Sequence, residues 1–314
     1  MAATQPASLA STYPVYLDLY ERGILRERVA QAQARLSACT LCPRVCHTDR
    51  LGDQAGECRV GRYALVYSAF PHFGEESVLR GWHGSGTVFF SGCNLRCVFC
   101  QNHDISQTTQ GEAVRPERLT KIFLDIQEMG CHNLNLVTPS HVVAQILEAL
   151  ELAIPQGLRL PIVYNTSGYD SVQALKLLAG IVDIYMPDLK YSDSRVAMDY
   201  SGVRAYWEVA RKAIAEMHRQ VGDLTVMDRL ARRGLLIRHL VLPEGLAGTR
   251  AVLAFIAALS QDSWVNLMDQ YRPAYRAFDH PELARPISRR EYQDAVAIAR
   301  HLGIHRGIPF DALS

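Results

Sequence analysis

The chain has 314 residues, a formal net charge of +1, and 48% hydrophobic residues. This length fits one large α/β domain with at most a small appendage, and the apolar content supplies a substantial core. The near-zero charge gives neither a basic field for nucleic acid nor an acidic tract typical of disorder. Residues 1–11 lack the pattern of a signal peptide, and the longest apolar run, residues 251–259, is far shorter than the roughly 20 residues that cross a bilayer. We therefore expect a cytoplasmic protein that binds neither membrane nor nucleic acid.

The chain opens with a tail and a helical stretch. Residues 1–13 are expected to be disordered, and the apolar positions of residues 15–36 predict one or two packing helices interrupted near Gly23. A possible strand pair follows at residues 63–67. The adjacent carboxylates Glu75 and Glu76 stand beside a glycine; a solvated turn is the expected role, with the holding of an amino group as the alternative.

Four cysteines lie close together in this N-terminal part, at C-x2-C-x3-C-x11-C spacing: Cys39, Cys42, Cys46 and Cys58. Without a secretion signal, clustered cysteines indicate metal binding more often than disulfides. Four thiolates form a complete ligand set for zinc or for an iron–sulfur cluster. The spacing fits neither template cleanly, so both metals stay open, as does the alternative of four reduced structural cysteines.

Three further cysteines, Cys93, Cys97 and Cys100, follow a predicted strand at residues 87–90. Soft sulfur ligands suit iron–sulfur clusters or zinc. A 4Fe–4S cluster needs four ligands, so three cysteines leave one iron open to a ligand from outside the protein. An open coordination position is typical of a catalytic metal site. The eighth cysteine, Cys131, stands alone; it could supply a fourth ligand, but core packing is its expected role.

Strands and helices alternate along the rest of the chain. Apolar periodicity predicts strands at residues 133–137, 160–165, 181–186, 235–242 and 264–268. It predicts helices at residues 116–129, 140–153, 170–178 (capped by Asp170), 205–218 and 250–259, and a last helix that begins at a Ser288/Glu291 capping box and runs to residue 301. Counted from residue 87 there are six βα units, which form a parallel sheet, doubly wound or curled into a barrel. Polar residues follow most strand ends, as in barrel active sites, and no G-x-G-x-x-G or P-loop supports a nucleotide-binding doubly wound fold, so we predict a partial (β/α)6 barrel.

The run Cys93-Asn-Leu-Arg-Cys97-Val-Phe-Cys100 after a strand resembles the signature of radical S-adenosylmethionine (SAM) enzymes, and the resemblance covers about residues 85–272. The flanking residues 84–92 and 100–106, and the early Cys-x2-Cys-Pro-Arg-x-Cys, resemble the branch related to pyruvate formate-lyase activating enzymes. The resemblance implies a radical SAM partial TIM-like barrel at residues 85–314, preceded by a helical and cysteine-rich metal-binding extension at residues 14–84.

The resemblance also implies cofactors and a reaction. A 4Fe–4S cluster would be bound by Cys93, Cys97 and Cys100, with S-adenosyl-L-methionine on its fourth iron. Reduction, with electrons from a donor such as flavodoxin or ferredoxin, would cleave S-adenosylmethionine to a 5′-deoxyadenosyl radical that abstracts hydrogen from a small-molecule or protein substrate. A glycyl radical enzyme is one such target. Modification of a small molecule or peptide is an alternative, and a non-catalytic iron–sulfur electron carrier or a zinc-stabilised scaffold is an alternative of a different class.

Five polar residues at strand ends resemble positions that contact the cofactor in this family: Asn165, Ser167, Asp188, Lys190 and Arg238. Asp188 and Lys190 match the Asp-x-Lys that holds the ribose and the methionine carboxylate, and a lysine ammonium suits a carboxylate. The alternative is that each is an ordinary buried polar residue. The usual Gly-Gly-Glu after the second strand is absent, which leaves Thr138, Ser140 or backbone carbonyls as weaker partners for the methionine amino group. The usual His-Asn-Pro after the motif is replaced by Gln101-Asn-His, so the substrate stays open.

Overall fold

The computed structural model describes residues 13–309, so the expected disordered tail lies, apart from Tyr13, outside the described residues. Six parallel strands form the centre of its sheet, in the order β2 (Ser85–Phe90), β4 (Leu134–Val137), β5 (Ile162–Thr166), β6 (Ile184–Pro187), β8 (Leu230–Leu240) and β9 (Trp264–Met268). Within the described residues, β9 pairs with no strand other than β8, so the barrel stays open. The predicted (β/α)6 partial barrel is confirmed.

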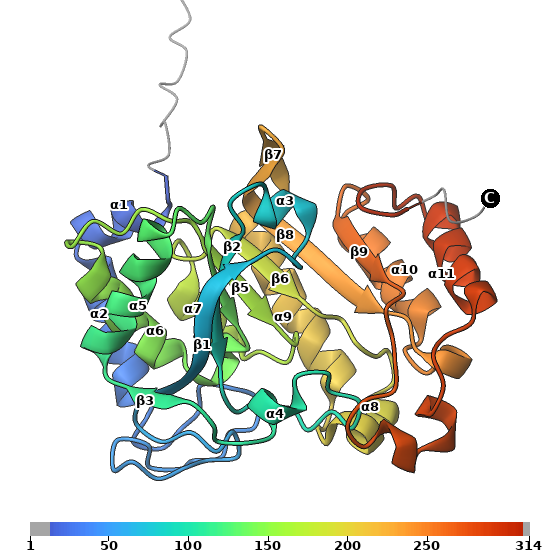
Figure 1. Ribbon diagram of the computed structural model, residues 1–314, viewed down its shortest axis with the longest axis horizontal. Coiled ribbons are helices and arrows are strands. Elements are labelled where there is room, and N and C mark those ends of the chain that lie inside the picture. The colour runs from blue at the N-terminus through green and yellow to red at the C-terminus, as the bar shows by residue number, and fades with distance from the viewer. Residues whose placement is uncertain (1–12, 310–314) are drawn as a thin grey trace, which may run out of the picture.

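Helices follow the parallel strands; most of them cover the outside of the sheet, while α4 and α8 lie below the strand ends in Figure 1. In chain order they are α4 (His103–Ser106), α5 (Pro116–Glu128), α6 (Val143–Ala153), α7 (Val172–Leu178), α8 (Ser194–Ser201), α9 (Tyr206–Val221), α10 (Thr249–Leu259) and α11 (Arg289–His301). Short 3-10 helices occur at η1 (Pro139–His141), η2 (Pro243–Gly245), η3 (Ala277–Asp279) and η4 (Pro281–Leu283). The capping box at the start of α11 is present as predicted, with Ser288 and Glu291 bonded reciprocally.

Some boundaries differ from the predictions for identifiable reasons. The helix expected from residue 140 begins at Val143, because Thr138 adopts a left-handed conformation and η1 precedes it. Asp170 does not cap α7; it is buried and accepts hydrogen bonds from Tyr164 Oη at 3.0 Å and Thr166 Oγ1 at 2.5 Å. Helix α8 was not predicted.

Antiparallel strands extend the sheet at both sides. β1 (Ala64–His72) pairs with β2, β3 (Glu112–Val114) pairs with β1, and β7 (Thr225–Met227) forms a hairpin with β8. The possible strand pair at residues 63–67 is therefore one longer strand. The predicted domain boundary at residue 85 stays a prediction, and β1, which precedes it, shares a sheet with β2.

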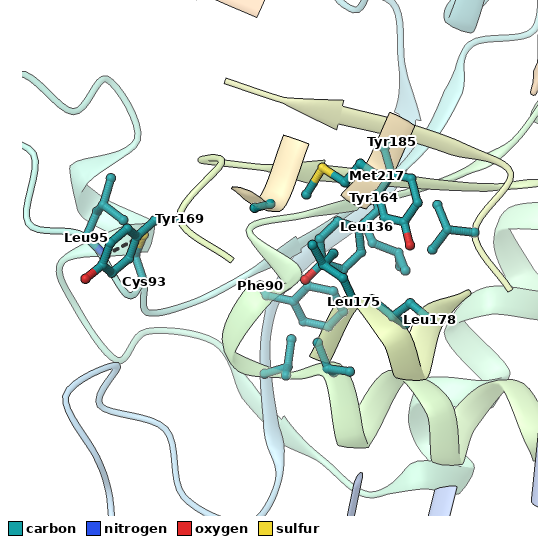
Figure 2. Packing of buried hydrophobic residues seen from close by; sticks show 14 of the residues in the cluster. Phe90, Cys93, Leu95, Leu136, Tyr164, Tyr169, Leu175, Leu178, Tyr185 and Met217 are labelled. Carbon is teal, nitrogen blue, oxygen red and sulfur yellow. Dashed lines mark hydrogen bonds between the residues drawn. The ribbon is translucent and has the colours of Figure 1, made fainter. Parts of the chain in front are cut away.

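Alternate residues of the strands face two different cores, since successive side chains on a strand point to opposite faces. One face packs against the outer helices and includes Leu136, Tyr164 and Tyr185, which Figure 2 shows with residues of α7 and α9. The other face points into the barrel, where Val163, Ile184, Met186 and Leu236 pack together. The short helix α3 (Ser77–Arg80) fills this interior with Val78 and Leu79. The next inward-facing positions along β5, β6 and β8 are Asn165, Asp188 and Arg238. They therefore lie at the carboxyl ends of the strands.

The N-terminal extension packs on the barrel through two helices, α1 (Tyr16–Glu21) and α2 (Ile24–Ala34). They are separated at Gly23, as predicted, where a backbone φ of +73° favours glycine. The cysteine-rich segment that follows runs below the sheet in Figure 1, beside β3 and α4. It therefore lies at the end of the barrel where the parallel strands finish.

Candidate active site

A cavity of about 260 Å³ lies at the carboxyl ends of the parallel strands. Each of the six strands contributes to it, either directly or through the residues that follow it: Cys93 and Cys97 after β2, Val137 and Thr138, Asn165 and Ser167, Asp188 and Lys190, Arg238 and Leu240, and Met268 and Gln270. Because parallel strands end at a common edge, residues nearly 180 positions apart in the chain meet here. This edge is where barrel enzymes place their active sites.

The three cysteines after β2 face this cavity, and each sulfur atom lies beside a hydrogen-bonding group. Cys93 Sγ accepts from the backbone N–H of Leu95 at 3.3 Å, and Cys97 Sγ accepts from Ser201 Oγ at 3.0 Å. Cys100 Sγ lies 3.1 Å from Ser106 Oγ. Figure 2 shows Cys93 and Leu95 beside Tyr169, well apart from the core around Phe90. Such donors stabilise thiolates and tune the potential of a bound iron–sulfur cluster.

Burial raises the pKa of Cys93 to about 12 and that of Cys97 to about 11, and the neighbouring thiols add to the first shift. For Cys97, the nearby Lys190 ammonium opposes the effect of burial. These thiols are therefore protonated until a metal displaces their protons. Within residues 13–309, no three or more His, Cys, Asp or Glu side chains are already drawn together as a metal cage.

Four of the five predicted cofactor contacts form one hydrogen-bonded network. Arg238 donates from Nε to Asp188 Oδ1 at 2.7 Å and from Nη2 to Asn165 Oδ1 at 2.7 Å. Lys190 Nζ donates to Asp188 Oδ2 at 2.6 Å. The register explains why they meet, because Asp188, directly after β6, forms a parallel bridge with Arg238 in β8. The sequence prediction that these residues share a site agrees with this geometry; their contact with a cofactor stays a prediction.

The charges of the network hold one another in the ionised state. Burial alone would raise the pKa of Asp188, but Arg238 and Lys190 outweigh it and hold the pKa below its usual range. Burial alone would lower the pKa of Lys190, but Asp188 and Cys97 raise it above its usual value. The network thus keeps two cations, Lys190 and Arg238, charged at the cavity, and such groups suit a ligand with a carboxylate.

The fifth residue, Ser167, lines the cavity with a buried hydroxyl that has no hydrogen-bond partner among the described residues. A buried polar atom without a partner is costly, so a bound ligand is its natural partner. Of the two weaker candidates for the amino group, Thr138 lines the cavity. The Ser140 hydroxyl instead lies 2.9 Å from Thr166 Oγ1, and Ser140 does not line the cavity.

Glu75 and Glu76 are not in a solvated turn, so this expectation is wrong. The loop after β1 enters the barrel, where the Glu75 side chain is only 9% exposed and lies 3.9 Å from Arg238 Nη1. Glu76 accepts a hydrogen bond from Asn266 Nδ2 in β9 at 2.8 Å. Burial raises the pKa of Glu75 to about 7, opposed by Arg238 and reinforced by Glu76. Both carboxylates therefore add negative charge near Arg238, on its barrel-interior side. No local sequence pattern indicated this role.

The four N-terminal cysteines lie together and close to the three-cysteine loop. Cys39, Cys42 and Cys58 are buried and Cys46 is partly exposed. Burial raises the pKa of Cys42 to about 12, and the other three sulfur atoms are near enough to raise it further. The isolated Cys131 is buried in the core, as expected.

Several contacts fix this segment to the three-cysteine loop. Arg44 Nε donates to the Asn94 carbonyl at 2.8 Å, Arg96 donates to the Glu57 carbonyl, and Arg59 donates to the Gln107 carbonyl. The backbone of Gly92 passes so close to Cys58 that a Cβ atom at this glycine would stand 2.4 Å from the Cys58 carbonyl oxygen. The two cysteine groups are therefore neighbours in space.

Comparisons with known proteins agree with this arrangement. The family model of the Radical SAM superfamily matches residues 87–230. A protein of Methanocaldococcus jannaschii described as "Uncharacterized protein MJ0674" is 30% identical over 293 residues, which cover 90% of this chain and 80% of that protein.

Two solved structures are similar at low identity. One is TYW1 with a lysine-pyruvate adduct bound, with a TM-score of 0.42 and 11% identity over 70% of this chain and 74% of that chain. The other is HydG, a maturase of the FeFe-hydrogenase, with a TM-score of 0.47 and 12% identity over 69% of this chain and 48% of that chain. Neither bears on the substrate of this chain. Within residues 13–309, no helix combines the length and apolar composition of a membrane span. The family match shows that residues 87–230, which carry the three-cysteine loop at the mouth of the partial (β/α)6 barrel, form a domain of the Radical SAM superfamily.

Proposed function

We propose that this radical SAM enzyme binds a 4Fe–4S cluster through Cys93, Cys97 and Cys100 and S-adenosyl-L-methionine at the adjoining strand ends. The cluster and S-adenosylmethionine supply a 5′-deoxyadenosyl radical, which abstracts hydrogen from a substrate. The observation that carries the proposal is that all three sulfur atoms and the Asp188–Lys190–Arg238 network line the same cavity.

The residues of the cavity fit these groups. The three sulfur atoms have hydrogen-bonding neighbours, and the unpartnered Ser167 hydroxyl is available to a ligand. Lys190 is the cation of the network whose charge acts directly on a cysteine of the loop, Cys97. We assign Lys190 to the methionine carboxylate and Asp188, whose charge Arg238 also balances, to a ribose hydroxyl. Arg238, which also donates to Asn165, holds Asp188 in place, and Thr138 or a backbone carbonyl receives the amino group.

The proposal extends to the partners and to a second cofactor. The four N-terminal cysteines bind a second metal, as zinc or as an iron–sulfur cluster. A cytoplasmic flavodoxin or ferredoxin delivers the electron. For the substrate we favour hydrogen abstraction from a glycyl radical enzyme, supported by the resemblance of residues 84–106 to the activating-enzyme branch. A small molecule or a peptide is the alternative, favoured by the replacement of the usual His-Asn-Pro by Gln101-Asn-His.

Cofactor binding can be tested without turnover. When S-adenosylmethionine binds a reduced cluster at its open iron, the electron paramagnetic resonance (EPR) spectrum of the cluster changes. The proposal predicts this change in the anaerobically reconstituted protein. In Lys190→Met the same change should need at least a tenfold higher concentration of S-adenosylmethionine, because one charge-assisted contact contributes about 1.5–3 kcal/mol to binding. Lys121→Met, which alters an exposed lysine paired with Asp125, is the matched control and leaves binding unchanged. An intact cluster whose spectrum does not respond to S-adenosylmethionine contradicts the proposal.

A further inference from the structure

The four-cysteine segment encloses an arginine whose charge has no carboxylate partner. Arg50 is completely buried. It donates from Nε to the Gly61 carbonyl at 2.9 Å and from Nη1 to the His141 carbonyl at 2.6 Å. The same Nη1 lies 3.8 Å from Cys39 Sγ, while Nη2 is buried without any hydrogen-bond partner. Among the described residues, its polar neighbours are thus two carbonyl groups and a sulfur atom.

This arrangement is unfavourable if the four cysteines remain neutral thiols. Arginine cannot lose its proton in a protein, so burial cannot neutralise Arg50. A buried charge is normally paired with an opposite charge or a metal centre, because leaving it unpaired costs the full loss of its hydration. The sulfur of Cys39 is a neighbour that can become an anion, and the charge of Arg50 also acts on the Cys58 thiol. A centre of four thiolates around zinc, or around a 4Fe–4S cluster, carries the surplus negative charge that Arg50 needs.

We propose that Cys39, Cys42, Cys46 and Cys58 hold their metal as an anionic tetrathiolate centre, with Arg50 as its buried counter-ion. This rests on the second metal centre of the proposed function and adds the charge of that centre and the residue that balances it. Arg50 is a positioning residue in this account, since it acts through Cys39 and the metal and touches no reacting atom. Zinc and an iron–sulfur cluster share the required chemistry, and the experiment distinguishes them.

Arg50 also links the two cysteine groups. It holds the His141 carbonyl, and the His141 ring lies 3.0 Å from the carbonyl oxygen of Ser91, two residues before Cys93. Metal at the N-terminal centre therefore fixes Arg50, His141 and the start of the three-cysteine loop in one arrangement. Loss of this metal is expected to loosen residues 91–100 even though their own ligands are intact.

The test uses the full chain with Cys93, Cys97 and Cys100 all changed to alanine. In this background the metal that remains belongs to the N-terminal centre, and failure of the radical chemistry cannot affect the result. Zinc, iron and sulfide are measured per chain after anaerobic purification, and metal affinity is measured by competition with a chelator. Arg50→Met is expected to lower the metal affinity at least tenfold, and Arg50→Lys is expected to retain more of the parent's affinity than Arg50→Met.

Arg62→Met is the matched control. Arg62 is another largely buried arginine between the extension and the barrel, but it is paired with Glu148 at 2.9 Å. The Arg62→Met variant should therefore retain the metal affinity of the parent. Zinc alone, or iron with sulfide, each supports the inference and identifies the metal. Absence of both from the parent chain overturns it, as does an Arg50→Met affinity equal to that of the parent or of Arg62→Met.

A second measurement covers the case in which Arg50→Met folds poorly. Chelation should lower the melting temperature of the parent by exposing the unpaired charge of Arg50 as well as by removing the metal. Arg50→Met lacks this charge, and its lost hydrogen bonds to the Gly61 and His141 carbonyls affect the metal-bound and metal-free forms alike. Chelation should therefore lower its melting temperature less than that of the parent. An equal or larger drop in Arg50→Met contradicts the counter-ion role.

Discussion

Asp188→Asn removes the one carboxylate that two buried cations share. Asp188 contacts Lys190 Nζ at 2.6 Å and Arg238 Nε at 2.7 Å, and the side chains of all three residues are less than one-fifth exposed. Asparagine retains one acceptor oxygen, so one of the two hydrogen bonds is lost. Lys190 loses its counter-charge, and Arg238 keeps the more distant Glu75 carboxylate, 3.9 Å away. Breaking a buried ion pair by removing one partner costs about 3–5 kcal/mol, and we expect a loss of unfolding free energy in this range.

The assay is urea unfolding of the reduced, metal-free protein followed by circular dichroism, so that metal loss does not contribute. Asp18→Asn, which alters an exposed pair with Arg22, is the control and should change stability by less than about 1 kcal/mol. Adding Arg238→Met to Asp188→Asn should restore part of the loss, because one cation that has lost its close partner is removed. Because the pKa of Asp188 is lowered in the folded state, its contribution is complete at neutral pH and disappears as the pH falls through that lowered pKa. A loss below about 1 kcal/mol at pH 7 would refute the view that this carboxylate holds the network together.

Three further predictions concern the surroundings of the site. Glu75→Gln should gain up to about 3 kcal/mol of stability relative to wild type between pH 5 and pH 8. Burial raises the pKa of Glu75 to about 7, so over most of this range the acid is ionised in the unfolded wild type but still protonated in the folded protein, and this difference favours unfolding. A stability difference between the variants that is the same in melts at pH 5 and pH 8 contradicts the burial argument. Gly92→Ala should lower stability by at least about 2 kcal/mol more than Gly130→Ala. Both glycines have φ near +78°, but of the two only Gly92 would place a Cβ against a backbone carbonyl. Equal urea midpoints would show that the Cys58 backbone does not restrict the residue at position 92. Ser201→Ala should lower the midpoint potential of the reconstituted cluster by on the order of 60 mV, because Cys97 loses a hydrogen bond; an EPR redox titration that matches wild type would show that this bond does not tune the cluster.

Much of the barrel could be predicted because alternate residues of its strands pack into two different hydrophobic cores. Val163, Ile184 and Leu236 face inward, while their neighbours Tyr164, Tyr185 and Leu235 face the helices. Both faces are apolar, so the strands are recognisable as short apolar runs that alternate with helical segments. The network was also predictable as a group of residues at strand ends, since parallel strands finish at one edge.

Other features could not be predicted because they depend on contacts between distant segments. The burial of Glu75 depends on Arg238, which is 163 positions away in the chain. The charge environment of Arg50 depends on His141 and Cys39, and no local pattern indicates that an arginine is enclosed. Asp170 has the residue type of a helix cap, but the hydroxyl of Tyr164 binds it more deeply in the fold.

The three thiolates and the strand-end network are proposed to act together on S-adenosylmethionine. The most direct measurement is the yield of 5′-deoxyadenosine per chain after anaerobic reconstitution and reduction in the presence of S-adenosylmethionine. We expect 5′-deoxyadenosine from the wild-type chain and only background from the variant in which Cys93, Cys97 and Cys100 are all alanine. Equal yields from the two proteins, with iron and sulfide bound in the wild type, would contradict it.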